Sequence, residues 1–116
     1  MLLGCNRNRI PELSIEEKKE VIADAKILQS KYTGIVEIEE KEWPESFIPL
    51  EPIIIKRYGE GIYIIRYKFV SHESGFFIPI PGYIPESDYG AGYEKLGEEL
   101  YYFWIPNENH KAEPVR

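Results

Sequence analysis

The sequence has few of the residues that build metal sites and disulfides. It contains one cysteine and two histidines in 116 residues. A single cysteine cannot form an intramolecular disulfide, and His72 and His110 are too far apart in sequence for a zinc motif. A glycine-rich phosphate loop is also missing, because Gly90-Ala91-Gly92 precedes a predicted strand instead of a helix. The sequence therefore predicts no metal, no cofactor and no catalytic residue.

Basic residues and long apolar runs are also scarce. The chain has 14 Lys and Arg against 20 Asp and Glu, which gives a formal net charge of -6. This balance argues against a phosphate backbone as partner, so we expect no nucleic-acid binding. Apolar runs stay well below the roughly 20 residues that cross a bilayer. The length and the 43% of hydrophobic residues suit one compact domain.

Aromatic and β-branched residues are plentiful after position 53. Residues 53–69 begin with three isoleucines and continue with alternating isoleucines and tyrosines, which favour strands. Gly59 and Gly61 can take the positive φ of a tight reversal, so this run predicts a β-hairpin. Alternation along the second strand predicts one core face, made by Tyr63, Ile65, Tyr67 and Phe69.

A single helix is predicted before the hairpin, over residues 15–32. Ser14 and Glu17 have the spacing of a capping box, in which each side chain bonds the other residue's backbone amide. An apolar stripe at three- and four-residue steps predicts that one face packs on a sheet. Gly34 stands where a left-handed C-cap residue is expected.

The remaining elements are short. We predict an edge strand at 35–42, one or two helical turns at 45–50, a third strand at 76–80, and a second hairpin of 93–96 and 100–105. The segment 71–75 is predicted as a polar turn. Pro79 predicts that the third strand lies at an edge or ends early, because proline cannot donate to a ladder.

These elements predict an α+β fold, with an N-terminal helix packed on a four- or five-stranded antiparallel sheet. The domain is expected at 14–106, after a polar tether at 1–13 and before a flexible tail at 107–116. One helix covers only one face of such a sheet, and the last strand has apolar residues on both faces. We expect residues 39–50, with a buried Trp43, to cover the second face.

The first residues carry a short motif. Leu2-Leu3-Gly4-Cys5 resembles the lipobox at which bacterial lipoprotein precursors are cleaved and lipidated. The resemblance implies a lipid on Cys5, attachment to the cell envelope, and membrane contact through that lipid alone. A basic segment and an apolar segment of a signal peptide do not precede the motif in this sequence. The alternative is a cytoplasmic protein with an incidental thiol.

A second resemblance covers about the last two thirds of the chain. It is carried by Trp43-Pro44 and by the segments 61–64, 73–78, 93–96 and 100–102, and it points to a group of small bacterial proteins without an assigned activity. It implies the fold only. The small acidic chain is also similar in style to immunity proteins, which neutralise the toxin of a neighbouring cell.

The function we expect is that of a small acidic protein-binding module, of immunity or envelope-lipoprotein type, with a basic protein as partner. Tyr101 and Phe103, on the face away from the helix, are the predicted anchors of this partner. Glu98 and Glu99 are the predicted rim charges that steer it.

Two alternatives stay open. The first is a small-ligand or carbohydrate-binding protein, because tyrosine and tryptophan platforms stack on sugar rings. The second, which we weigh least, is a hydrolase using His72 with its neighbours Ser71, Glu73 and Ser74. Adjacent strand or turn residues point in different directions, so their closeness in sequence does not make a catalytic pair.

Overall fold

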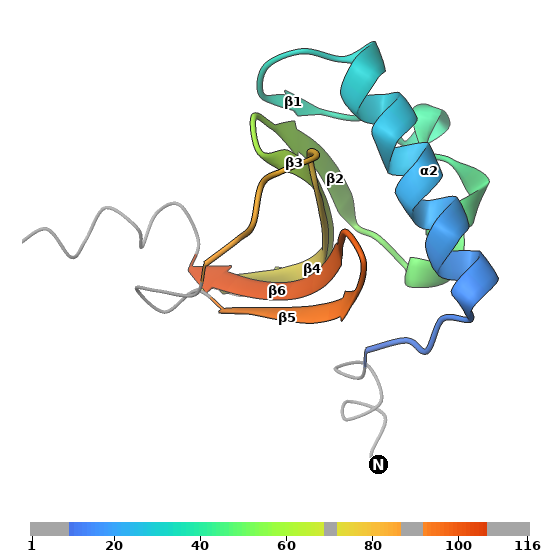
Figure 1. Cartoon of the computed structure of the whole chain (residues 1–116). Coiled ribbons are helices and arrows are strands. Elements are labelled where there is room, and N and C mark those ends of the chain that lie inside the picture. The colour runs from blue at the N-terminus through green and yellow to red at the C-terminus, as the bar shows by residue number, and fades with distance from the viewer. Residues whose placement is uncertain (1–9, 69–71, 87–91, 107–116) are drawn as a thin grey trace, which may run out of the picture.

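The computed structural model describes residues 10–68, 72–86 and 92–106. In these residues one α-helix, two short 3-10 helices and six strands form a helix packed on one antiparallel sheet (Figure 1). The strand order is β1-β2-β3-β4-β6-β5. The predicted α+β fold is confirmed, with six strands where four or five were expected.

The elements have the following bounds. The helix α2 spans Ile15–Lys31, and the 3-10 helices η1 and η2 span Glu40–Glu42 and Glu45–Leu50. The strands are β1 (Val36–Glu37), β2 (Ile54–Tyr58), β3 (Gly61–Lys68), β4 (His72–Pro79), β5 (Gly92–Gly97) and β6 (Leu100–Pro106). Both predicted hairpins are present, as β2–β3 and β5–β6.

Helix α2 begins at the predicted capping box. The Glu17 backbone N–H donates to Ser14 Oγ at 3.1 Å, and the Ser14 N–H donates to Glu17 Oε1 at 2.8 Å. The helix ends one residue before the predicted end, because Tyr32 is already extended as the C-cap. Gly34 takes a φ of 75°, but it lies beyond the cap. The buried stripe of the helix consists of Val21, Ala25 and Leu28.

The first core lies between α2 and the sheet. Phe47 and Leu50 of η2 are fully buried in it, together with the helix stripe. Segment 39–50 therefore covers the same face as the helix, and the prediction that it covers the other face is wrong. Trp43 packs against this core, and Ile10 and Leu13 do so too, so packing reaches residues N-terminal to position 14. The members from the sheet are Ile55, Ile62, Ile64, Phe76, Ile78, Leu100 and Tyr102.

Strand β4 differs most from the prediction. Residues 72–75, expected in a turn, are its first half, and the strand is central, between β3 and β6, not at an edge. Gly75 allows this pairing, because a Cβ at that position would collide with the carbonyl oxygen of Ile64 on β3. Pro79 is the last residue of the strand, so its missing N–H falls at the end of the ladder.

Both faces of β3 are buried, although only one was predicted to be core. Ile62 and Ile64 face the helix, and Tyr63 and Ile65 face away from it. A β-bulge follows Ile65 and shifts the alternation, so Tyr67 lies opposite Ser74 on the helix side of the sheet. The predicted position of Tyr67 beside Tyr63 is therefore wrong, and Phe69 lies outside the described residues.

Candidate functional site

The face of the sheet away from α2 carries a second core, which is mainly aromatic. Its buried members are Tyr63, Ile65, Phe77 and Phe103. The ring of Tyr63 stacks on that of Phe77 at 4.3 Å between centroids, and it meets Phe103 edge-on at 5.0 Å. Such pairs stabilise a core by about 0.5–1.5 kcal/mol each beyond the area that they bury.

The sheet curls around this second core. The hydroxyl oxygens of Tyr63 on β3 and Tyr93 on β5 lie 3.1 Å apart, although β4 and β6 separate their strands. Three strand spacings amount to about 14 Å in a flat sheet. A bend of the sheet between the two strands shortens the path that the two side chains have to span. In Figure 1 the sheet bends from β3 round to β5, and the chain after β4 crosses its hollow side.

That crossing segment, residues 80–86, covers part of the concave face. The Ile80 N–H donates to the Glu60 carbonyl oxygen at 2.9 Å, which ties the segment to the β2–β3 turn. The ring of Tyr83 then meets Phe77 edge-on, with 6.1 Å between centroids, and Pro85 is buried. Among the described residues it is this connection, and not segment 39–50, that covers the second face.

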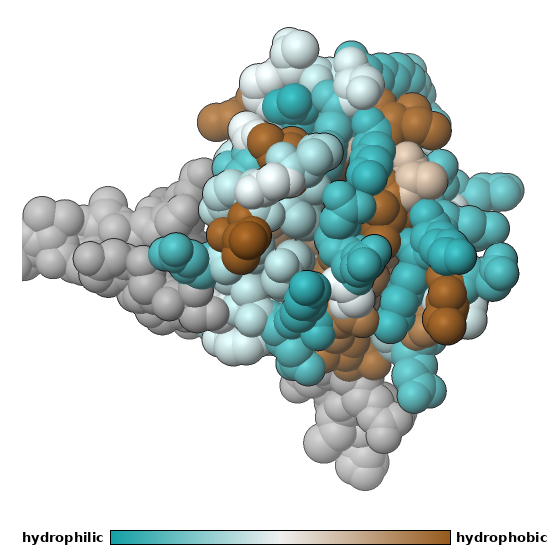
Figure 2. All heavy atoms as spheres, in the orientation of Figure 1, coloured by the Kyte–Doolittle hydropathy of each residue, from teal (hydrophilic) through white to brown (hydrophobic). Residues whose placement is uncertain are grey.

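Four partly exposed tyrosines surround the second core, and we call them the tyrosine rim. Ile84, next to Tyr83 in sequence, is also exposed. In the view of Figure 2, the exposed hydrophobic side chains form several separate patches, with hydrophilic side chains between them. The rim thus combines ring faces with polar hydroxyl tips, on three strands and on the segment that follows β4. Its members are Tyr58, Tyr83, Tyr93 and Tyr101.

A hydrogen-bond chain runs through the concave face. The Tyr63 hydroxyl donates to Glu60 Oε2 at 3.1 Å, because a carboxylate can only accept. With that proton committed, the Tyr93 hydroxyl donates to the Tyr63 oxygen. Burial, followed by the Tyr93 hydrogen bond and the charge of Glu60, raises the pKa of Tyr63 above its ordinary value. Tyr63 is therefore a protonated donor at neutral pH and not a base.

Acidic groups lie at one end of the rim. The Ile80 N–H donates to the Glu60 carbonyl oxygen and the Tyr83 N–H donates to the Ile80 carbonyl oxygen at 3.1 Å, so the backbone holds Tyr83 close to the β2–β3 turn. Burial raises the pKa of Tyr83, and the negative charges of Glu60 and Glu86 raise it further. Two cations lie on the same concave face, with Lys56 opposite Tyr63 on β2 and Lys95 opposite Tyr101 on β5. The rim is acidic at the β2–β3 turn and basic along its sides.

The predicted partner residues have different fates. Tyr101 is partly exposed on the tyrosine rim, on the face where it was expected. Phe103 lies on the same face but is 0% exposed, so it supports the rim from below and offers no surface to a partner. Glu98 is exposed in the β5–β6 turn, whereas Glu99 Oε1 lies 3.0 Å from Lys26 Nζ of α2. Cys5 is outside the described residues.

His72 and Glu73 do not form a catalytic pair. They are neighbours in β4, so their side chains point to opposite faces of the sheet. His72 is exposed, whereas Glu73 is buried on the concave side. Glu73 Oε1 has no hydrogen-bond partner among the described residues, and Lys68 Nζ lies 3.9 Å from it.

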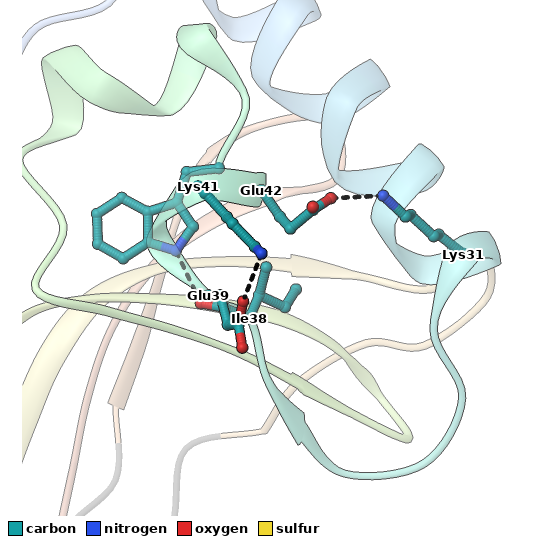
Figure 3. A network of polar contacts seen from close by, with 6 residues as sticks. Lys31, Ile38, Glu39, Lys41 and Glu42 are labelled. Atoms are coloured by element: carbon teal, nitrogen blue, oxygen red, sulfur yellow. Dashed lines mark hydrogen bonds and ion pairs between the residues drawn. The ribbon is translucent and has the colours of Figure 1, made fainter.

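A polar network at the other end of the molecule has a structural explanation. Lys31 Nζ at the end of α2 lies 2.6 Å from Glu42 Oε1, and this hydrogen bond raises the pKa of Lys31 and lowers that of Glu42 (Figure 3). The Trp43 indole N–H donates to the Ile38 carbonyl oxygen at 2.9 Å. Trp43 was predicted to be buried; it is half-buried, packs against the first core and has its polar atom satisfied.

The chain matches no protein-family model, and comparisons with curated proteins and with solved structures found no match either. Within the described ranges no cluster of three or more His, Cys, Asp or Glu could hold a metal ion. In the same part of the chain, no helix is long and apolar enough to span a membrane.

Glu60, Tyr63 and Tyr93 were not singled out from the sequence. Tyr63 was predicted only as a core residue, and Glu60 only as part of a turn. The only feature of the sequence that could have pointed to this site is that Tyr63 and Tyr93 both lie on predicted strands. That feature cannot reveal their contact, because the contact depends on the curl of the sheet.

Proposed function

We propose that this protein is a small acidic protein-binding module and that the tyrosine rim is its contact surface. The observation that carries the proposal is a set of partly exposed tyrosines on a curled sheet and on the segment that crosses it, with a buried aromatic core beneath them. Tyrosine is among the residue types that most often supply binding energy at protein interfaces. The net charge of -6 favours a basic partner by electrostatic steering.

Tyr101 is the best single anchor in this proposal. Its ring lies at 6.4 Å from Phe77 between centroids and between the neighbouring strands β4 and β5, so it is held before any partner arrives. A side chain that is already ordered loses little conformational entropy on binding. Contacts made by Tyr101 would therefore be reflected almost fully in the affinity.

Site-specific photocrosslinking tests the proposal. We would replace Tyr101 with the photoreactive p-benzoylphenylalanine in the full chain and irradiate cells that produce it. A protein of basic isoelectric point should be crosslinked. The matched control carries the same group in place of Ile27, which is 62% exposed on the outer face of α2. Equal crosslinking from both positions, or none from position 101, would refute the rim as the contact surface.

The cellular setting is part of the same proposal. An envelope lipoprotein anchored through Cys5 would present the domain at a membrane surface, and an immunity protein would bind a toxin directly. Both roles require a protein-binding surface, and neither requires a catalysed reaction. The identity of the crosslinked protein distinguishes them, because a toxin is expected in one case and an envelope component in the other.

A carbohydrate-binding function is a second candidate, and one observation favours it. The indole of Trp104 lies on Gly92, where a Cβ would collide with the ring, and the side chain is still 43% exposed. Tyr67 lies in the same cross-strand row, two strands away, on the same face. A glycan array, with Trp104→Ala as the matched variant, tests this: binding lost with the variant supports it, and an array without hits contradicts it.

A further inference from the structure

We infer that the end of the tyrosine rim next to the β2–β3 turn receives an arginine side chain of the protein partner, between the Glu60 carboxylate and the ring of Tyr83. This inference rests on the proposed function and specifies the chemistry that the partner brings to it. It commits to a guanidinium group on a basic protein, presented in an exposed segment.

The Glu60 carboxylate is prepared for such a group. One oxygen, Oε2, accepts the Tyr63 hydroxyl at 3.1 Å, which fixes the orientation of the carboxylate. The other oxygen, Oε1, has no hydrogen-bond partner in the part of the chain that the structure describes. The side chain is half-buried, so an additional charged hydrogen bond would form in a partly desolvated place, where it is stronger than in water.

The surroundings add charge and an aromatic face. Glu86, three residues after Tyr83 in the same segment, is a second carboxylate, and in the described ranges neither it nor Glu60 forms an ion pair with a lysine or arginine. Tyr83 is 40% exposed, so part of its ring is available to a ligand. A guanidinium is planar, stacks on an aromatic ring and donates in a fork that matches a carboxylate. An ammonium group has neither the plane nor the fork.

The remaining charges on the concave face restrict the orientation of the partner. Lys56 and Lys95 lie on either side of the central row of the face, opposite Tyr63 and Tyr101. A partner with arginines everywhere would be repelled at these two places. The best fit is therefore a segment with one arginine facing the β2–β3 turn and neutral or acidic residues at its flanks.

Three blocked tripeptides test the inference on the full-length protein: Gly-Arg-Gly, Gly-Lys-Gly and Gly-citrulline-Gly. Citrulline has the shape of arginine without its charge. Binding is followed by NMR through the chemical shifts of Glu60, Tyr83 and Tyr93. We expect weak, saturable binding of the arginine peptide at these residues, and affinities at least about tenfold lower for the other two peptides, because a charged hydrogen bond is lost or badly placed. Equal shifts with all three peptides, or none with any, would overturn the inference.

Glu60→Gln is the decisive variant. Glutamine keeps an oxygen for the Tyr63 hydroxyl, so the fold is retained while the charge is removed. Binding of the arginine peptide should weaken about tenfold. Glu20→Gln removes the same charge from the exposed surface of α2, on the other side of the sheet, and should leave binding unchanged. Equal losses in both variants would mean that only the overall charge matters and would contradict the assigned site.

The partner found by crosslinking separates this inference from the proposed function. If its affinity falls with Tyr101→Ala but not with Glu60→Gln, the rim is the contact surface and the arginine site is wrong. If neither variant weakens it, the proposed surface itself is wrong. A fall with both variants supports the two together.

Discussion

The hydroxyl oxygen of Tyr63 on β3 lies 3.1 Å from that of Tyr93 on β5, with β4 and β6 between the two strands. The two side chains meet across the concave face of the sheet, which is filled with aromatic rings. The contact also aligns the Tyr93 and Tyr63 hydroxyls with the Glu60 carboxylate. The same curl that closes a core thus gathers the tyrosine rim and its acidic end.

Stability should fall at alkaline pH through Tyr63. Its pKa in the folded protein is raised, so above about pH 10 the unfolded chain loses this proton while the folded protein keeps it. The contribution of the protonated Tyr63 to the free energy of unfolding is therefore fully present below about pH 10, and it decreases by about 1.4 kcal/mol per pH unit above that pH. Urea unfolding measured from about pH 8 to about pH 11 checks this.

Tyr63→Phe is the matched variant for that measurement. It should be less stable at neutral pH by about 1 kcal/mol, because two hydrogen bonds are lost. Above about pH 10 its stability should fall less steeply than that of the wild type. Parallel pH profiles for the two proteins would contradict the raised pKa.

Gly75→Ala should destabilise the protein strongly. A Cβ at this position collides with the carbonyl oxygen of Ile64, so β3 and β4 would have to move apart. The cost should be at least about 2 kcal/mol in the free energy of unfolding. Gly59→Ala is the control, because nothing lies within 4 Å of a Cβ there, and it should change stability by less than about 0.5 kcal/mol. Similar denaturation midpoints for both variants would contradict the close approach of the strands.

Loss of the Phe103 ring should destabilise the protein more than loss of the Tyr101 ring. Phe103→Ala removes a fully buried ring and should cost about 3–5 kcal/mol in the free energy of unfolding. Tyr101→Ala removes a partly exposed ring and should cost clearly less. Thermal unfolding of both variants checks the order. The reverse order would mean that Tyr101, and not Phe103, is the core residue.

The proposal that Cys5 carries a lipid predicts labelling of the native gene product by a palmitate analogue. Cys5→Ser should abolish that labelling, because the thiol that carries the lipid is removed. Labelling that persists in the variant would exclude Cys5 as the acceptor.

Local features were predictable from the sequence, and long-range geometry was not. The capping box of Ser14 and Glu17 and both hairpins were predicted, because they depend on residues close in sequence. The first half of β4 was missed, because its polar residues at 72–74 resemble a turn and only the partners β3 and β6 make it a strand. The position of Pro79 at the end of a central strand likewise depends on those partners.

The candidate site was predictable only in part. Tyr101 was placed on the correct face by alternation, but the same alternation could not show that the curl buries Phe103 beneath it. Glu99 was grouped with Glu98, although a turn directs it to Lys26 of α2, which is distant in sequence. Coverage of the second face was assigned to segment 39–50, because the sequence gives no sign that Phe47 and Leu50 join the helix side.

The most direct test of the tyrosine rim is the binding kinetics of the crosslinked partner, measured by surface plasmon resonance at low and high salt. Tyr101→Ala should accelerate dissociation at least about tenfold, because anchor residues act mainly on the dissociation rate. Glu98→Lys should slow association and flatten its salt dependence, with little change in dissociation. Unchanged dissociation of Tyr101→Ala, with the fold intact by circular dichroism, would contradict the proposed contact surface.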